Sequence, residues 1–271
     1  EAYAANCAEL HRRQAEPDSP EDLASIPILK RSDIRREIEK FEVREEKIGN
    51  NPLLYVPAVT NKIAYLNWYF DISGIDGKLL PYCYLLTDIL GKFNTKRYTY
   101  EEIATNSIMY TGGIVFNVRA FSDTDDADKY RISFSLKAKS LMENLPKLFD
   151  ILQAVALESD LSDVKRFQEL LAEVKTDWDG SFFNRGQAVA ISRLYSYCSA
   201  AARVNEQDQF TYYQFLKDLV ENFQAKGEEA LATLRKLLLK FFQNTCYMLA
   251  YSCDEDLQAE LRRSAQQDFL P

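Results

Sequence analysis

The chain has 271 residues, of which 46% are hydrophobic and 27% charged, a composition typical of a globular protein with a full apolar core. Its net charge of −8 argues against a nucleic-acid partner, because phosphate backbones are held by clustered Lys and Arg. Its apolar segments fall short of the roughly 20 residues that a membrane span needs. We therefore expect neither a nucleic-acid nor a membrane partner.

The first residues predict a helical arm. Residues 1–15 have helical character, and a linker rich in Pro, Ser and Asp follows them. Within this linker, Ser19 precedes Pro20 in a pattern that begins a short helix. We expect a helical arm and linker over residues 1–24 and an α+β domain over residues 25–271. Since the chain does not begin with Met, we interpret it as a piece of a longer polypeptide.

The rest of the chain alternates strand-like and helix-like segments. Residues 41–49 and 53–58 predict two edge strands, and residues 62–72 carry apolar side chains at even positions, which indicates a strand with one dry face. Capping boxes are predicted at Thr99, at Ser140 and at Thr211. Strands are further predicted over 114–122, 131–138 and 246–253, and helices over 78–93, 99–110, 141–157, 161–199 with a break at 178–180, 212–223, 227–242 and 254–267.

The order of these segments indicates the fold class. Residues 114–122 and 131–138 predict an antiparallel hairpin, with Arg131, Ser133, Ser135 and Lys137 on a wet face, and the helices are grouped. This pattern favours an α+β fold with an antiparallel or mixed sheet covered by helices.

Metal ligands and catalytic bases are sparse. His11 is the only histidine and follows Cys7 by four residues, but two ligands do not make a zinc site, so we interpret it as a surface or helix-packing histidine. Ser-His-Asp and Cys-His mechanisms thereby lose their usual base. The acidic segment 123–128 lacks the Gly and Glu of a calcium loop, so a solvated hairpin turn is favoured.

The cysteines and the aromatic residues give two further expectations. The odd number of cysteines and their apolar surroundings predict buried free thiols in a reducing compartment, and a thiol enzyme is disfavoured because no basic neighbour lowers the pKa of Cys83 or Cys198. Tyr65, Asn67 and Tyr69, on the wetter face of 62–72, are candidates for a ligand-binding wall, and an open sheet edge would accept a peptide by strand addition. The alternative is that they pack under a neighbouring domain. The cysteines are Cys7, Cys83, Cys198, Cys246 and Cys253.

Three stretches carry a resemblance to a known family. They are SPEDLASIPILKRSDIRREIEKF (19–41), LPYCYLLTDILGKFNTKRYTYEEIATNSIMYTGGIVFNV (80–118) and NRGQAVAISRLYSYCSAAARVNEQDQFTYYQFLKDL (184–219). In this order they resemble the pitrilysin/insulinase superfamily of zinc metallopeptidases, in its presequence-protease-like branch. The resemblance implies the end of a connecting helical hairpin followed by a non-catalytic third domain.

The resemblance also has a consequence for the helix predicted over 78–93. In the catalytic first domain of such enzymes this helix carries H-x-x-E-H, whose histidines bind zinc while the glutamate activates water. Alignment through Gly91 places Tyr82, Leu85 and Leu86 at the His, Glu and His positions. The resemblance therefore implies no catalytic residue and no metal ligand in this chain. Zinc is expected in a catalytic domain of the parent protein.

Two functions follow from the resemblance. The first is a non-catalytic chamber wall in a zinc-dependent endopeptidase that degrades short unstructured peptides; this chain by itself is then expected to be inactive. The alternative is a catalytically inactive scaffold or partner-binding subunit of the same superfamily. The expected partners are the other domains of the same polypeptide and peptide substrates. The expected location is the cytoplasm of a bacterium, or an organellar matrix if the source is eukaryotic.

Overall fold

Two units make up the chain, Glu1–Phe41 and Glu42–Pro271. The structure is a computed structural model and describes residues 2–38, 40–48, 51–126, 128–243 and 248–268. Its boundary between the units follows Phe41, and the domain boundary expected after residue 24 stays a prediction.

The first unit contains the two helices expected from its sequence. Helix α1 spans Ala2–Ala15 and α2 spans Pro20–Ser25. The hydroxyl of Ser19 accepts a hydrogen bond from the Asp22 N–H at 3.1 Å, which satisfies one of the free donors at the start of α2. The predicted helix start is confirmed, and a short 3₁₀ turn, Arg31–Asp33, follows it.

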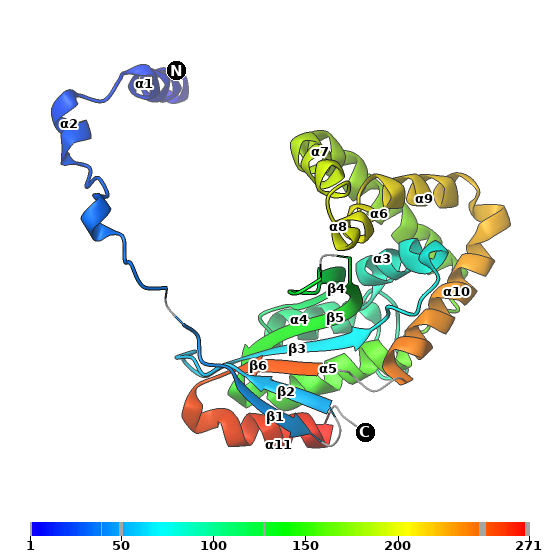
Figure 1. Cartoon of the computed structure of the whole chain (residues 1–271). Coiled ribbons are helices and arrows are strands. Elements are labelled where there is room, and N and C mark those ends of the chain that lie inside the picture. The colour runs from blue at the N-terminus through cyan, green and yellow to red at the C-terminus, as the bar shows by residue number, and fades with distance from the viewer. Residues whose placement is uncertain (1, 39, 49–50, 127, 244–247, 269–271) are drawn as a thin grey trace. The chain divides into compact units, whose positions relative to one another are not determined.

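A six-stranded sheet in the order β1-β2-β6-β3-β5-β4 forms the centre of the second unit (Figure 1). Strands β1 and β2 form one antiparallel pair and β4 and β5 another, while β6 runs parallel to β2 and antiparallel to β3. The mixed sheet confirms the expected α+β class. The strands are β1 (Arg44–Ile48), β2 (Asn51–Tyr55), β3 (Ile63–Asp71), β4 (Ile114–Ser122), β5 (Tyr130–Leu141) and β6 (Met248–Ser252).

Helices cover one face of this sheet, because the even positions of β3 are apolar. Trp68 contacts Phe149 edge-on, with 6.2 Å between ring centroids, and Phe70 contacts Phe242 at 5.2 Å. These contacts bring α5 and α10 onto the dry face, where α11 also packs on α5. The helices of this unit are α3 (Leu80–Ile89), α4 (Tyr100–Tyr110), α5 (Leu145–Glu158), α6 (Val164–Asn184), α7 (Gly186–Tyr195), α8 (Ala200–Glu206), α9 (Phe210–Glu221), α10 (Phe223–Gln243) and α11 (Gln258–Asp268).

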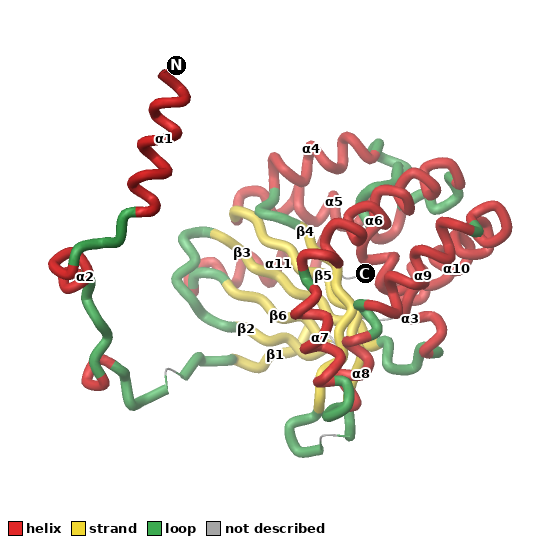
Figure 2. Tube along the Cα trace, turned by 90° about the horizontal axis from the view of Figure 1, so that it is seen from above, coloured by secondary structure: helices red, strands yellow, loops and turns green. Residues whose placement is uncertain are grey.

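The opposite face of the sheet is largely open. Figure 2, which looks from above, shows β1, β2, β6 and β3 without a helix over them. Helix α8 packs against β4 and β5. The sheet is therefore asymmetric, with a dry face under helices and a face that solvent or a partner can reach. Among the described residues, no helix is long and apolar enough to cross a membrane.

Several sequence-based boundaries are wrong, and tertiary pairing explains the first two. Strand β2 is not an edge, because β6 pairs with it from the other end of the chain. The capping box expected at Ser140 does not form: Ser140 and Leu141 complete β5, paired with Ala64 and Ile63, and α5 begins after Asn144.

Two helix boundaries also differ from expectation. Helix α6 continues through Gly180, and the break falls at Arg185, before α7. Thr211 lies inside α9, which begins at Phe210, so it is not a cap. The capping box at Thr99 is confirmed, with its hydroxyl and the Glu102 side chain each bonded to the other's backbone N–H.

Candidate functional site

The open face of β3 carries the residues that sequence analysis singled out. Tyr65 is 40% exposed, and Asn67 and Tyr69 are half-buried, whereas the even positions between them lie in the core. The structure therefore places Tyr65, Asn67 and Tyr69 in one row on the reachable face. Because β3 lies inside the sheet, between β6 and β5, this row offers side chains and not a free strand edge. Its role as a wall stays a prediction.

The register extends this row across the sheet. Lys139 of β5 lies opposite Tyr65, and Lys137 opposite Asn67. Both lysines are exposed. On the other side of β3, Ala250 of β6 is opposite Asn67. Directly opposed residues share a face of the sheet, so two aromatic rings, an amide and two ammonium groups point the same way.

Part of the expected wet face of β5 is dry. Ser133 is 1% exposed and Ser135 is 5% exposed. Each serine lies between longer side chains on the neighbouring strands; Ser135, for example, is flanked by Tyr69 and Asn117. The small side chains are shaded by their neighbours, which sequence alternation alone does not reveal.

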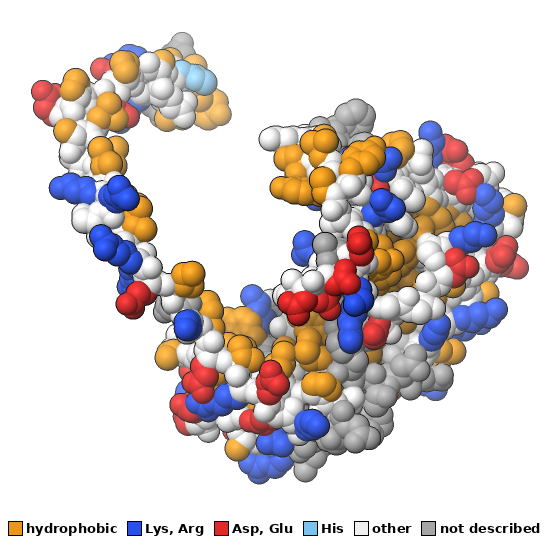
Figure 3. Space-filling view, viewed as in Figure 1, with side chains coloured by type: hydrophobic (Ala, Val, Ile, Leu, Met, Phe, Trp, Pro, Cys, Tyr) orange, Lys and Arg blue, Asp and Glu red, His pale blue; other side chains and the backbone are white. Residues whose placement is uncertain are grey.

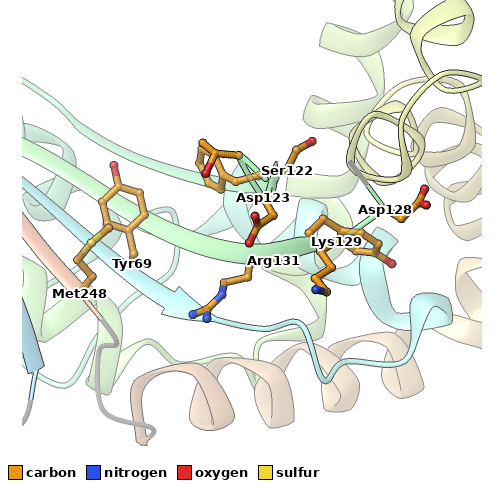
Figure 4. Close-up of a pocket in the computed structure, with 10 residues that line it drawn as sticks. Tyr69, Ser122, Asp123, Asp128, Lys129, Arg131 and Met248 are labelled. Atoms are coloured by element: carbon orange, nitrogen blue, oxygen red, sulfur yellow. The ribbon is translucent and has the colours of Figure 1, made fainter. Parts of the chain in front are cut away.

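A surface hollow of about 720 Å³ lies at the end of this face, beside the β4–β5 turn. Figure 4 shows Tyr69 and Met248 on one side of it, and Arg131, Asp123 and Lys129 on the other. The acidic segment here forms the turn of the hairpin, as expected: the Asp123 N–H donates to the Lys129 carbonyl at 2.9 Å. Lys129 is also paired with Asp126 at 3.1 Å, so the charges of the turn partly compensate each other.

Helix α3 holds the positions aligned with the zinc motif. Leu85 and Leu86 are fully buried, and the ring of Tyr82 packs edge-on against Phe215 at 4.7 Å. Two leucines offer no donor atom to a metal, and the residues present do not fit a zinc ion. Cys83 on the same helix is buried too, and burial raises the pKa of its thiol to about 12. Within the described part of the chain, no group of three or more His, Cys, Asp or Glu side chains is placed to hold a metal.

The polar side chains of α3 serve its packing. The Tyr212 hydroxyl donates to the Asp88 carboxylate at 2.6 Å, and the Tyr84 hydroxyl donates to the Val204 carbonyl at 3.0 Å. Burial raises the pKa of Asp88, while the hydrogen bond from Tyr212 opposes the rise. These bonds tie α3 to α8 and α9. Asp88 therefore fills a structural role in a buried cluster of aromatic rings.

Asp208, between α8 and α9, belongs to the same region. Burial, together with the negative charge of Asp88, raises the pKa of Asp208 to about 7, and the positive charges of Arg185 and Arg119 oppose this. Sequence analysis missed both carboxyl groups, because no local pattern marks an aspartate as buried.

The thiols and the histidine are only partly as expected. Cys83 and Cys253 are buried and free, which confirms the expectation for them. Cys198 is exposed and Cys7 is half-buried, so the expectation of burial was wrong for these two; Cys246 lies outside the described residues. His11 is exposed on α1, in agreement with a surface histidine.

An apolar patch on α7 is a second exposed feature. Figure 3 shows apolar side chains gathered over this helix. The exposed fractions are 42% for Ile191, 67% for Leu194 and 63% for Tyr195. The expectation of one long helix over 161–199 concealed this patch, since a continuous helix would keep one stripe against the core. Grouped apolar side chains of this kind are typical of contact surfaces.

Comparisons with known proteins place these features in a family. The family model for the domain associated with peptidases of family M16, subfamily C, matches residues 1–219. Protein HypA of Clostridium perfringens is 30% identical over 93% of the chain and 26% of its own length. A mitochondrial presequence protease of Yarrowia lipolytica is 24% identical over 97% of the chain and 26% of its own length. The chain thus spans about a quarter of the curated relatives it matches.

One solved structure shows the same fold. The crystal structure of a conserved protein from Enterococcus faecalis V583 has a TM-score of 0.58 and 12% identity, over 84% of this chain and 52% of the other. At this identity the likeness supports the arrangement of helices and strands alone.

Proposed function

The chain belongs to this peptidase-associated family, as a presequence-protease-like, non-catalytic domain of the pitrilysin superfamily, and from this premise we propose that it forms part of the wall of a peptidase chamber. In this proposal a zinc endopeptidase encloses short unstructured peptides, and the chain contributes enclosure rather than chemistry. The single observation that carries the proposal is the open face of the sheet, with Tyr65, Asn67 and Tyr69 in one row.

The nature of this face supports enclosure. Aromatic rings offer apolar contact to many side chains, and an amide between them donates to and accepts from a peptide backbone. Such a surface holds peptides of varied sequence without selecting one. The helix that would carry the reaction is α3, and its Leu85 and Leu86 are core residues. The same fold therefore supplies a wall where the catalytic copy supplies a metal.

The length of the relatives supports a division of labour. Two of them are named presequence proteases, and the chain covers 26% and 24% of their length. In the proposal, a zinc site of the H-x-x-E-H kind lies in another part of the same longer polypeptide. Reading the complete gene for that motif is the first check.

The decisive experiment uses the complete gene product and an unstructured fluorogenic peptide. We expect cleavage that stops with a chelator and returns with zinc, while this chain alone shows no zinc-dependent cleavage. Replacing Tyr65 and Tyr69 by Ser should raise KM more than it lowers kcat, because the wall binds substrate without touching the reacting atoms. The matched control replaces Tyr195 and Tyr197 of the α7 region by Ser and should leave KM unchanged.

The alternative function has a clear signature in the same assay. If the complete gene product, loaded with zinc, cleaves no unstructured peptide, the chamber-wall proposal is wrong and the scaffold function is favoured. If the Tyr65 and Tyr69 substitutions leave KM unchanged in an active enzyme, the sheet face is not part of the wall.

A further inference from the structure

Two lysines on the open sheet face are the starting point. Lys137 and Lys139 are both exposed on β5 and are separated by one residue whose side chain points into the core. Residues two apart on a strand lie on the same face about 6.6–6.8 Å apart, because each residue advances about 3.3–3.4 Å. The two ammonium groups therefore rise from the sheet in a row at the repeat of an extended chain.

These lysines have no charge partner of their own. In the described ranges, neither Lys137 nor Lys139 forms an ion pair. By contrast, Lys92, Lys129 and Lys175 are each paired with a carboxylate. Unpaired ammonium groups side by side repel each other and remain hydrated, so a ligand with two negative groups at the matching distance would relieve the repulsion.

The position of Lys139 is partly fixed by the backbone beneath it. A Cβ atom added to Gly112 would lie 2.9 Å from both Cγ and Cε of Lys139. The stem of the lysine thus lies against the glycine, where a larger residue would displace it. A side chain held in this way loses less conformational freedom when it binds a ligand.

The neighbours of the lysines suit a peptide. Tyr65 lies opposite Lys139, and Asn67 lies opposite Lys137. Each ammonium group therefore stands beside a group that contacts an apolar side chain or a peptide backbone. Around this set the sheet face is also positive, with Arg119 and Arg131 exposed on β4 and β5 and Asp71 as the acidic neighbour on β3. This is the reverse of the chain as a whole, whose net charge is −8.

We propose that Tyr65, Asn67, Lys137 and Lys139, named here the basic sheet face, bind an extended peptide that carries two carboxylates two residues apart. The peptide lies along β5, so that side chains at i and i+2 reach Lys137 and Lys139 while the residue between them points away. The inference rests on the proposed function, which supplies peptides to this face, and adds a preference for an acidic-x-acidic pattern.

The test measures binding by fluorescence anisotropy, with the whole 271-residue chain and fluorescein-labelled 12-residue peptides. Three peptides share one neutral background: the first has Glu at i and i+2, the second has Glu at i and i+1, and the third has Gln at i and i+2. We expect the first to bind about ten times more tightly than the second or third, because only its carboxylates share one face. Adding 0.5 M salt should remove most of this preference.

Matched variants locate the site. Replacing both lysines by Glu (Lys137→Glu with Lys139→Glu) should abolish the preference, whereas replacing both by Arg should keep it. The control places the same charge change on exposed helix positions, Lys165→Glu with Lys236→Glu, and should leave the preference unchanged. All four lysines are exposed, so circular dichroism should show the same fold for every variant.

Two results would overturn the inference. One is equal binding of the i,i+2 and i,i+1 peptides, and the other is an unchanged preference after Lys137 and Lys139 are reversed. A 12-nucleotide single-stranded RNA that competes as strongly as the acidic peptide would also contradict it. The proposed function fails separately, through absence of zinc-dependent cleavage by the complete gene product, whatever the anisotropy shows.

Discussion

The side-chain amide of Asn205 pairs with both backbone groups of Ala120. Its Oδ1 accepts from the Ala120 N–H at 2.7 Å, and its Nδ2 donates to the Ala120 carbonyl at 2.9 Å. Asn205 lies on α8 and Ala120 on β4, which is an edge of the sheet. The amide thereby takes the place of one residue of a further strand, and fastens α8 to the edge that carries the β4–β5 turn.

Replacing Asn205 by Ala should cost about 1–3 kcal/mol in the free energy of unfolding, because two backbone groups lose their partner. The measurement is urea unfolding, together with hydrogen exchange of the Ala120 amide, which should become faster. The control is Asn184→Ala, at an exposed position at the end of α6. Unchanged exchange at Ala120 would show that α8 is held by other contacts.

The stability of the chain should fall as the pH rises from about 4 to about 7, through Asp208. In the unfolded chain this carboxyl loses its proton near its ordinary pKa of 3.8, whereas in the folded chain its pKa is about 7. Its contribution to stability is thus fully present below pH 3.8 and is lost as the pH passes 7.

The variant Asp208→Asn stays neutral at every pH and tests this directly. At pH 8 it should be more stable than the natural chain, by on the order of 2 kcal/mol, and its advantage should vanish near pH 4. Urea unfolding at several pH values gives both quantities. Asp18→Asn, at an exposed position in the linker, serves as the control. An equal gain for both variants would assign the effect to net charge rather than to burial.

The thiols should differ sharply in their reaction with iodoacetamide. Cys198 is exposed and should be labelled first in the native chain. Burial raises the pKa of Cys83 to about 12 and that of Cys253 to about 11, so both should stay unlabelled until urea unfolds the chain. Mass spectrometry of peptide digests measures each site. Rapid labelling of native Cys83 would revive the interpretation as a thiol enzyme.

Restoring the zinc motif on α3 should not create a metal site. The variant Tyr82→His, Leu85→Glu, Leu86→His places polar groups at two fully buried positions. We expect a loss of at least about 3 kcal/mol in stability, from lost apolar burial and from a buried charge. The single variant Tyr82→His, at a half-buried position, should lose only about 1 kcal/mol with its contact to Phe215. Tight zinc binding by a stable triple variant, seen by calorimetry, would contradict this account.

The amino-acid sequence by itself determined the local elements and the family. The alternation of 62–72, the capping box at Thr99 and the turn at 123–128 depend on neighbours within a few residues, and each is present in the structure. The order of the three quoted stretches indicated the family that the comparisons show. The loss of donors at Tyr82, Leu85 and Leu86 was likewise readable from the chain alone.

Only the tertiary structure decided which residues meet. Strand β6 pairs with β2 and β3 from the far end of the chain, and nothing local in either segment specifies that partner. The register of β3 against β5 brings Lys137 to Asn67 and Lys139 to Tyr65, and a shift of one residue would turn these side chains to the other face. The same holds for the shaded Ser135 and the buried Asp208. Burial and sheet register are set by contacts distant in sequence, whereas helix caps and strand periodicity arise within one segment.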